Sequence, residues 1–299
     1  MRPLWAALLC LALAGCQAKK SESLHIDPEL ETLIPADTVF VVGANVDAIR
    51  DTPVFQKLLS RMPLPQLDYF AQRTGLDPRK DLSQLLTCSN GKTGLLLARG
   101  KFKAQELEAR LAANGAKPFV YKKYNLFGDE RAAFFVWNPS TVIAGPAADL
   151  RSIIDRTGAR GLPTAIRDLL RTLPANDQIY AALAGGLEGL NLTIPQDSNL
   201  GNITNVLRSI DSATLGMDLR SGIAVTAEVT SKTERDAKFV HDMVKGIVGF
   251  GRLNTPDNRP EMLKLYDAIK VEQQQTKTKV TADIPAGLGD RFLDLWLKR

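Results

Sequence analysis

Apolar residues recur along the chain with two spacings, and each spacing predicts a different kind of element. Short apolar or alternating runs bounded by Gly, Pro, Asn or Asp predict β-strands. The expected strands and hairpins are Val39–Gly43, Thr93–Arg99, Pro118–Tyr124, Arg131–Trp137, Thr141–Ala144, Gln178–Ala184, the hairpin Ala213–Val229, the strand Gly222–Ser231, and Lys277–Pro285.

Apolar residues three or four positions apart predict helices. The expected helices are Val46–Arg61, Pro65–Thr74, Ala104–Asn114, Ala147–Arg156, Thr233–Phe250 and a last helix that includes Phe292, Leu293 and Leu297. Gly75 is expected to end one helix in the left-handed conformation. Asp77 is expected to cap the next helix, with Pro78 at its first position.

The order of these elements repeats. The run Leu173–Asp177 precedes a strand as Ile34–Asp37 does, and a later strand-to-helix pair echoes Thr93–Asn114. Hairpins between the strands favour antiparallel sheets. We therefore predict an α+β fold of two tandem, diverged repeats of mainly antiparallel sheet packed with helices, over residues 32–160 and 161–299, with the boundary near 158–172.

The N-terminal residues have the pattern of an export signal. Arg2 precedes an apolar run from Leu4 to Ala14, which is too short to span a bilayer. Leu13-Ala14-Gly15-Cys16 resembles the lipobox of bacterial lipoproteins. The resemblance implies cleavage between Gly15 and Cys16 and a diacylglyceryl group on the thiol of Cys16. An ordinary signal peptide with a chance cysteine is the alternative.

Cys16 is followed by Gln17, whereas Asp at that position resembles an inner-membrane retention signal. We therefore expect a lipid anchor in the outer membrane, with the body facing the periplasm. Two acyl chains give the stable anchoring that one chain does not. Residues 16–31 are expected to form the lipidated cysteine and its tether. Lys19 and Lys20 would contact acidic head groups or belong to a solvated linker.

Composition narrows the function classes. Loss of residues 1–15 from the 299-residue chain leaves 284 residues, and loss of Arg2 lowers the formal charge from +5 to +4. The chain is 44% hydrophobic and 24% charged, as in an ordinary globular protein. Its dispersed Lys and Arg residues and its export signal argue against a nucleic-acid partner.

No residue pattern points clearly to catalysis, a cofactor or a metal. Cys88 is left without a partner after Cys10 is removed and Cys16 is lipidated, and its apolar neighbours predict a buried, inert thiol. The two histidines, His25 and His241, are too far apart in sequence to suggest a metal site. The Gly-rich segment 184–189 lacks the Lys-Ser/Thr ending of a phosphate loop and is expected to be a turn. Gly246, Gly249 and Gly251 are expected to allow close packing or to end a helix.

One carboxylate pair and one helix suggest sharper alternatives. Asp218 and Glu228 lie on neighbouring predicted strands, where they would face each other as hydrolytic acids or belong to a solvated sheet face. The helix after residue 233 has a broad apolar face that would normally be buried against a sheet. If the cleft beside it stayed open, it would hold an acyl chain or an apolar peptide.

Three further segments resemble a family of uncharacterised exported bacterial proteins. They are Ile34-Pro35-Ala36-Asp37-Thr38-Val39, Leu76-Asp77-Pro78-x-x-Asp81 and Arg99-Gly100-x-Phe102. The resemblance covers most of the mature chain and agrees with the predicted fold, but it implies no activity, cofactor or catalytic residue.

The sequence therefore predicts a membrane-anchored lipoprotein of the bacterial envelope with a non-catalytic binding or structural role. Its partners would be the membrane, through the lipid on Cys16, and a protein or apolar ligand. The first alternative is a periplasmic carrier or receptor for lipid or another apolar ligand, which requires an apolar cavity of roughly 300–1,000 Å³. A hydrolase is the second alternative.

Overall fold

The computed structural model describes residues 23–61, 64–158, 161–186, 208–256 and 259–296. The predicted signal peptide, the predicted cleavage site at Gly15 and the predicted lipidation site at Cys16 lie outside these residues, as do residues 17–22 of the expected tether. None of the helices within the described ranges has both the length and the apolar character needed to cross a bilayer.

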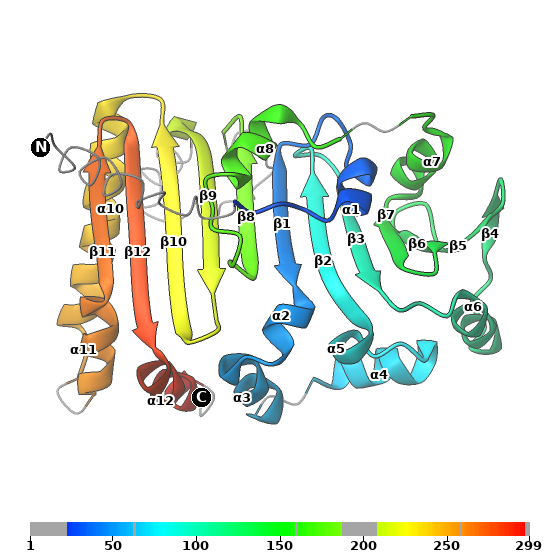
Figure 1. Cartoon of the computed structure of the whole chain (residues 1–299), viewed down its shortest axis with the longest axis horizontal. Coiled ribbons are helices and arrows are strands. Elements are labelled where there is room, and N and C mark those ends of the chain that lie inside the picture. Colours follow the sequence, from blue (N-terminus) through cyan, green and yellow to red (C-terminus); the bar gives the residue numbers. More distant parts are fainter. Residues whose placement is uncertain (1–22, 62–63, 159–160, 187–207, 257–258, 297–299) are drawn as a thin grey trace, which may run out of the picture.

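The strands form one twelve-stranded sheet in the order β11-β12-β10-β9-β8-β1-β2-β3-β7-β6-β5-β4, and each neighbouring pair is antiparallel (Figure 1). The strands are β1 (Phe40–Asn45), β2 (Leu82–Ser89), β3 (Gly94–Gly100), β4 (Phe119–Tyr121), β5 (Tyr124–Gly128), β6 (Ala133–Asn138), β7 (Thr141–Gly145), β8 (Ile179–Ala184), β9 (Ile210–Asp218), β10 (Gly222–Ser231), β11 (Ile269–Gln274) and β12 (Lys277–Pro285).

The sheet consists of two halves joined through β1 and β8. Moving outward from β1, the order is β2, β3, β7 and β6, and moving outward from β8 it is β9, β10, β12 and β11. The two halves thus repeat one strand order, as the sequence predicts. The α+β class with a mainly antiparallel sheet is confirmed, and the division at residue 160 stays a prediction.

The described helices are α1 (Pro28–Leu33), α2 (Val46–Arg50), α3 (Pro53–Arg61), α4 (Pro65–Thr74), α5 (Pro78–Asp81), α6 (Ala104–Ala113), α7 (Ala147–Asp155), α8 (Thr164–Leu170), α10 (Glu234–Leu253), α11 (Pro260–Asp267) and α12 (Ala286–Trp296). Gly75 ends α4 with φ +74°, and the Asp77 side chain caps α5, as predicted. The single helix expected over 46–61 is wrong. It divides into α2 and α3 because Pro53 lacks the N–H that a continuous helix needs.

One strand prediction is wrong, and the strand β2 is not among the predicted strands. The run 118–124 is not one strand, because Lys122 adopts φ +52° and turns the chain back between β4 and β5. The strand β2 follows α5 directly, without the turn residues that mark the other strands. The short helix α8 lies within the segment 158–172, where the boundary between the two repeats is expected.

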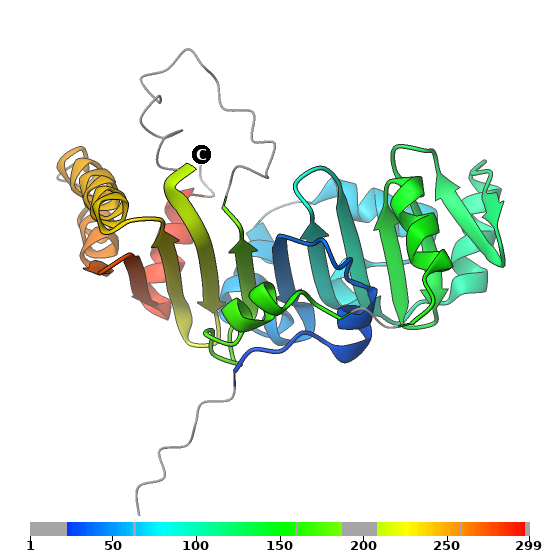
Figure 2. The ribbon, with the colours of Figure 1, turned by 90° about the horizontal axis from the view of Figure 1, so that it is seen from above.

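The main core lies on the sheet face that points toward the reader in Figure 1, which we call the front face. Helices α1, α7 and α8 cover it, as the view from above shows (Figure 2). Leu24, Ile26 and Leu30 from the N-terminal segment are buried in this core at 4%, 4% and 1% exposure. Residues 24–31 therefore belong to the folded body. The expectation that the tether runs to residue 31 is wrong, because the apolar residues of this segment find places in the core.

Candidate functional site

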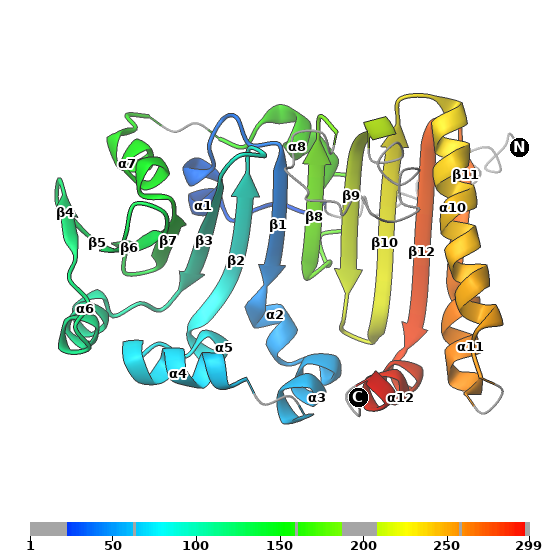
Figure 3. The ribbon, with the colours of Figure 1, turned by 180° about the vertical axis from the view of Figure 1, so that it is seen from behind.

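The opposite face of the sheet, which we call the back face, points toward the reader in Figure 3. It carries apolar residues, most of which are only partly buried. Successive side chains of a strand point to opposite faces of the sheet, so the back face carries the residues that alternate with the core residues along each strand. Its apolar residues include Phe40, Val42, Leu85, Leu96, Ala98, Phe134, Val142, Ile179, Ala181, Leu183, Leu215, Met217, Val225, Ala227 and Val229. Two of them, Ala98 and Leu183, are buried. Most are partly exposed, and Leu96 is 39% exposed.

The front-face neighbours on β1, β2 and β3 are far better covered. Val41, Leu86 and Leu97 are each 0% exposed. The difference comes from the helices: among the described elements, α2 to α5 and α12 lie at the strand ends on the back side, and only α10 runs along the sheet there (Figure 3). A continuous, partly exposed apolar surface of this kind marks an interaction site in many soluble proteins.

Helix α10 covers the outer edge of the back face but leaves part of its own apolar surface exposed. Thr233 caps it, and Ala237 and Val240 are buried against the sheet, where the Thr278 hydroxyl donates to the Ala237 carbonyl at 2.9 Å. The residues left exposed are Phe239 (47%), Ile247 (64%), Phe250 (71%) and Leu253 (86%). The prediction of a broad apolar face is confirmed, but its complete burial against the sheet is wrong.

The exposed side chains of α10 lie on the flank that points away from the sheet edge. Arg252 is ion-paired with Asp267 of α11, the helix that leads into the edge strand β11. At about 100° per residue, Phe239 and Phe250 lie on the opposite side of the helix from Arg252. These side chains give α10 an exposed apolar flank beside the end of the back face that the helix covers.

The structure does not bring Asp218 and Glu228 together. Asp218 pairs with Ala224 and Glu228 with Thr214, so the two carboxylates lie four residues apart along β10, roughly 13 Å. Lys277 contacts Glu228 at 2.6 Å, and Arg220 contacts Asp218 at 2.6 Å. The hydrolytic pair is wrong, and the solvated sheet face is the better description.

The predicted burial of Cys88 is confirmed, and its inertness stays a prediction. Cys88 is 1% exposed, and burial raises the pKa of its thiol to about 12, although a hydrogen bond with Thr38 acts in the opposite direction. His25 contacts the Ser23 carbonyl and His241 contacts Asp242, so the histidines do not meet. The described ranges hold no group of three or more His, Cys, Asp or Glu side chains placed to bind a metal ion.

The predicted glycine roles are partly testable. Gly185 and Gly186 have φ of +85° and +76° and continue from β8 into a turn, while residues 187–189 lie outside the described ranges. Gly251 allows close packing, since a Cβ there would lie 2.6 Å from the Tyr266 hydroxyl. Gly246 and Gly249 have open space at that position and neither pack closely nor end α10.

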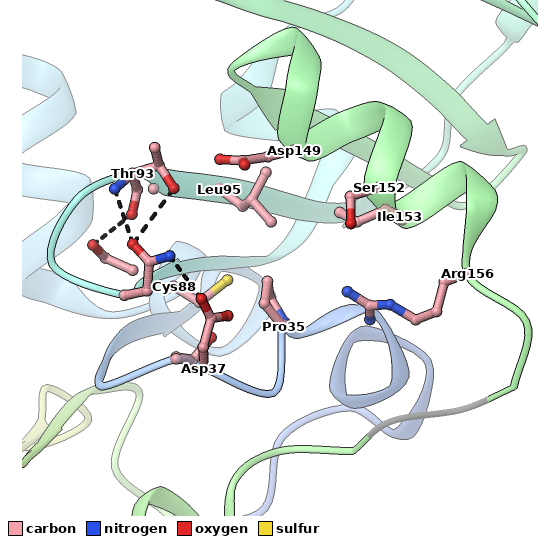
Figure 4. Close-up of a pocket in the computed structure, with 13 residues that line it drawn as sticks. Pro35, Asp37, Cys88, Thr93, Leu95, Asp149, Ser152, Ile153 and Arg156 are labelled. Atoms are coloured by element: carbon pink, nitrogen blue, oxygen red, sulfur yellow. Dashed lines mark hydrogen bonds between the residues drawn. The ribbon is translucent and has the colours of Figure 1, made fainter.

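A small polar hollow lies at one end of β2 and β3, beside α7 (Figure 4). Its volume is about 130 Å³, and Asp37, Asp149, Ser152 and Arg156 are among its lining residues. A larger, open hollow of about 700 Å³ continues along α7 past Arg151 and Asp155. The charged walls do not suit an acyl chain, so these hollows do not provide the apolar cavity that the carrier hypothesis requires.

Comparison with known proteins adds information on the fold alone. The chain resembles TP0453 in fold. Crystal form III of that protein superposes with a TM-score of 0.50 at 10% identity, over 92% of this chain and 99% of that chain. Forms I and IV give TM-scores of 0.45 and 0.48 at 10% and 8% identity, over 91% of this chain and 98% and 97% of theirs. No family model and no curated protein matches the chain.

Proposed function

We propose that this chain is a lipid-anchored, non-catalytic protein of the bacterial envelope whose folded body binds an apolar partner on its back face. The observation that carries the proposal is the partly exposed apolar back face, with the exposed apolar flank of α10 beside it. Water contact over such a surface is unfavourable by roughly 25 cal/mol per Å² of apolar area. A partner that covers it gains that free energy on binding.

The anchoring part of the proposal rests on the lipobox resemblance at Cys16. Retention on the outer membrane, facing the periplasm, rests on Gln17. Substitution of Cys16 by Ser should abolish incorporation of labelled palmitate and the shift to the processed form. Continued processing of the variant would contradict the anchor without affecting the binding surface.

Covering of the back face can be measured by cysteine labelling. Cys88 provides a silent background because it is buried. Leu96→Cys places a thiol on the back face, and Lys279→Cys places one on the exposed front side of the second half. We expect a polar maleimide to label both positions in purified protein, and only Lys279→Cys at an undiminished rate in native membranes. Equal rates at Leu96→Cys in the two preparations would refute a covered back face.

A second candidate function is that of a periplasmic carrier or receptor that holds a lipid or another apolar ligand on the open back face, since the hollows beside α7 do not provide the enclosed apolar cavity expected from the sequence. In a carrier, the back face would bind and shield an acyl chain, whereas in the first proposal it binds a protein or another apolar partner. Native purification followed by mass spectrometry distinguishes the two: a carrier copurifies lipid in near-stoichiometric amount, and the amount falls in Leu96→Gln but not in Val120→Gln. Val120 is 68% exposed on the far edge strand β4 and is the matched control.

A further inference from the structure

The two halves of the sheet build the same polar link twice, with donor and acceptor exchanged. In the first half, the Asn90 amide donates to Asp37 at 2.8 Å. In the second half, the Asn176 amide donates to Asp218 at 2.8 Å. The positions correspond, because Val41 pairs with Cys88 as Tyr180 pairs with Gly216, and the linked residues lie at equal distances from these pairs along the chain.

The residue after the link differs in chemistry between the halves. Thr38 is buried in the first half and is hydrogen-bonded with the Cys88 thiol. The corresponding residues of the second half are Asp177 and Gly216. A Cβ on Gly216 would lie 2.0 Å from Asp177 Oδ2, so the carboxylate occupies space that a side chain fills in the first half. Since the first half makes this junction with a neutral threonine, the fold itself does not require an ionisable group there.

The surroundings of Asp177 disfavour its charge. Its Oδ2 atom is buried and has no hydrogen-bond partner among the described residues. The charged groups that face it both come from the β9–β10 hairpin: Asp218 opposes its ionisation and Arg220 favours it. Burial, together with Asp218, raises the pKa of Asp177 to about 6. Asp218 remains ionised because Arg220 and the amides of Gln178 and Asn176 bond its oxygens and hold its pKa well below the usual range.

The segment that carries Asp177 also holds the N-terminal segment in place. The Leu24 amide donates to the Leu173 carbonyl at 3.0 Å, and Ser23 forms a β-bridge with Pro174. Residues 173–178, which we call the strap, therefore connect the N-terminal segment to the β9–β10 hairpin. Other ionisable groups lie near this contact: His25 bonds the Ser23 carbonyl, and Glu31, Arg167 and Arg171 line one hollow together with Leu24 and His25.

We propose that the strap is proton-sensitive: when Asp177 is ionised it is repelled by Asp218 and loosens the hold on residues 23 and 24, and when it is protonated the hold tightens. The proton goes onto the Asp177 carboxylate from water and leaves the same way. If the anchor at Cys16 is correct, the strap sets the length of chain between the lipid and the body. The pH response itself does not depend on the anchor.

Hydrogen exchange at the Leu24 amide tests this in the full chain. We expect the protection factor in wild type to rise about threefold to fivefold between pH 7.5 and pH 5.0, which is less than the approximately tenfold that a fully buried group with this shift would give over the same range. Asp177→Asn should show high protection at both pH values, and His25→Asn should keep the wild-type response.

A second variant guards against a folding defect in the first. Asp177→Thr introduces the residue that the first half uses at this position, and it should behave as Asp177→Asn does. The proposal is overturned if the neutral variants leave protection at pH 7.5 at the wild-type value, or if the wild-type response is lost in His25→Asn. Neither result bears on the back face, whose labelling is read separately.

Discussion

The burial of the N-terminal segment makes a quantitative prediction for Leu30. This side chain from α1 is 1% exposed and belongs to the main core. Leu30→Ala removes buried carbon atoms and leaves a cavity, which costs about 2–5 kcal/mol in other cores. If the segment were a solvated tether, the same substitution would change the free energy of unfolding by less than about 0.5 kcal/mol.

Urea unfolding of the full chain measures this difference. With a slope of about 3 kcal/mol per M, a loss of about 3 kcal/mol lowers the midpoint by about 1 M. Leu253→Ala is the control, because Leu253 is 86% exposed at the end of α10. Equal midpoints for the two variants would refute the assignment of residues 24–33 to the folded body.

Three further outcomes follow from individual side chains. Glu29→Gln should lower the free energy of unfolding by about 2 kcal/mol at pH 7 and by less at pH 3, as measured by urea unfolding. Burial raises the pKa of Glu29, but hydrogen bonds from Asn138 and Thr141 and the charge of Arg99 lower it overall. The stabilisation by the ionised carboxylate is therefore lost as the pH falls through the lowered pKa of Glu29. Asp177→Asn should stabilise by about 1 kcal/mol at pH 7.5 and not at pH 4, because a raised carboxyl pKa costs stability progressively as the pH rises above the ordinary value of 3.8 and in full only above about pH 6; no gain at pH 7.5 would contradict this. Cys88 should react with iodoacetamide at pH 8 about a thousandfold more slowly than a free thiol until the chain unfolds, and rapid labelling of folded protein would show that burial is incomplete.

The sequence predicts an element well where local residues mark its ends, and less well where the element depends on contacts with residues far away in the chain. Gly75, Asp77 and Pro78 mark helix ends by their own backbone and side-chain chemistry, so α4 and α5 match the prediction. The strand β2 is not predicted from the sequence because it follows α5 without a turn, and because its pairing with β1 and β3 depends on residues outside the strand itself. The tether is overestimated for a similar reason, since Leu24 and Leu30 find their core partners only in the folded chain.

The sequence contains a feature that indicates an apolar back face, namely consecutive apolar residues in two strands. Phe40, Val41 and Val42 are all apolar, as are Leu95, Leu96 and Leu97, so these strands are apolar on both faces. Strands of this kind normally lie in sheets covered on both sides. Which face lacks cover depends on where the helices dock, and that is decided by long-range packing. The corresponding polar links at Asp37 and Asp218 cannot be recognised from the sequence either, because Asn and Asp exchange positions between the two halves.

Photo-crosslinking tests the binding surface most directly. A diazirine amino acid at position 96 on the back face is compared with one at position 279 on the front side of the other half, in cells that produce the full chain. The account predicts a defined adduct, with protein or lipid, from position 96 and none from position 279. Absence of an adduct at 96, or the same adducts from both positions, would contradict the proposal that the back face binds an apolar partner.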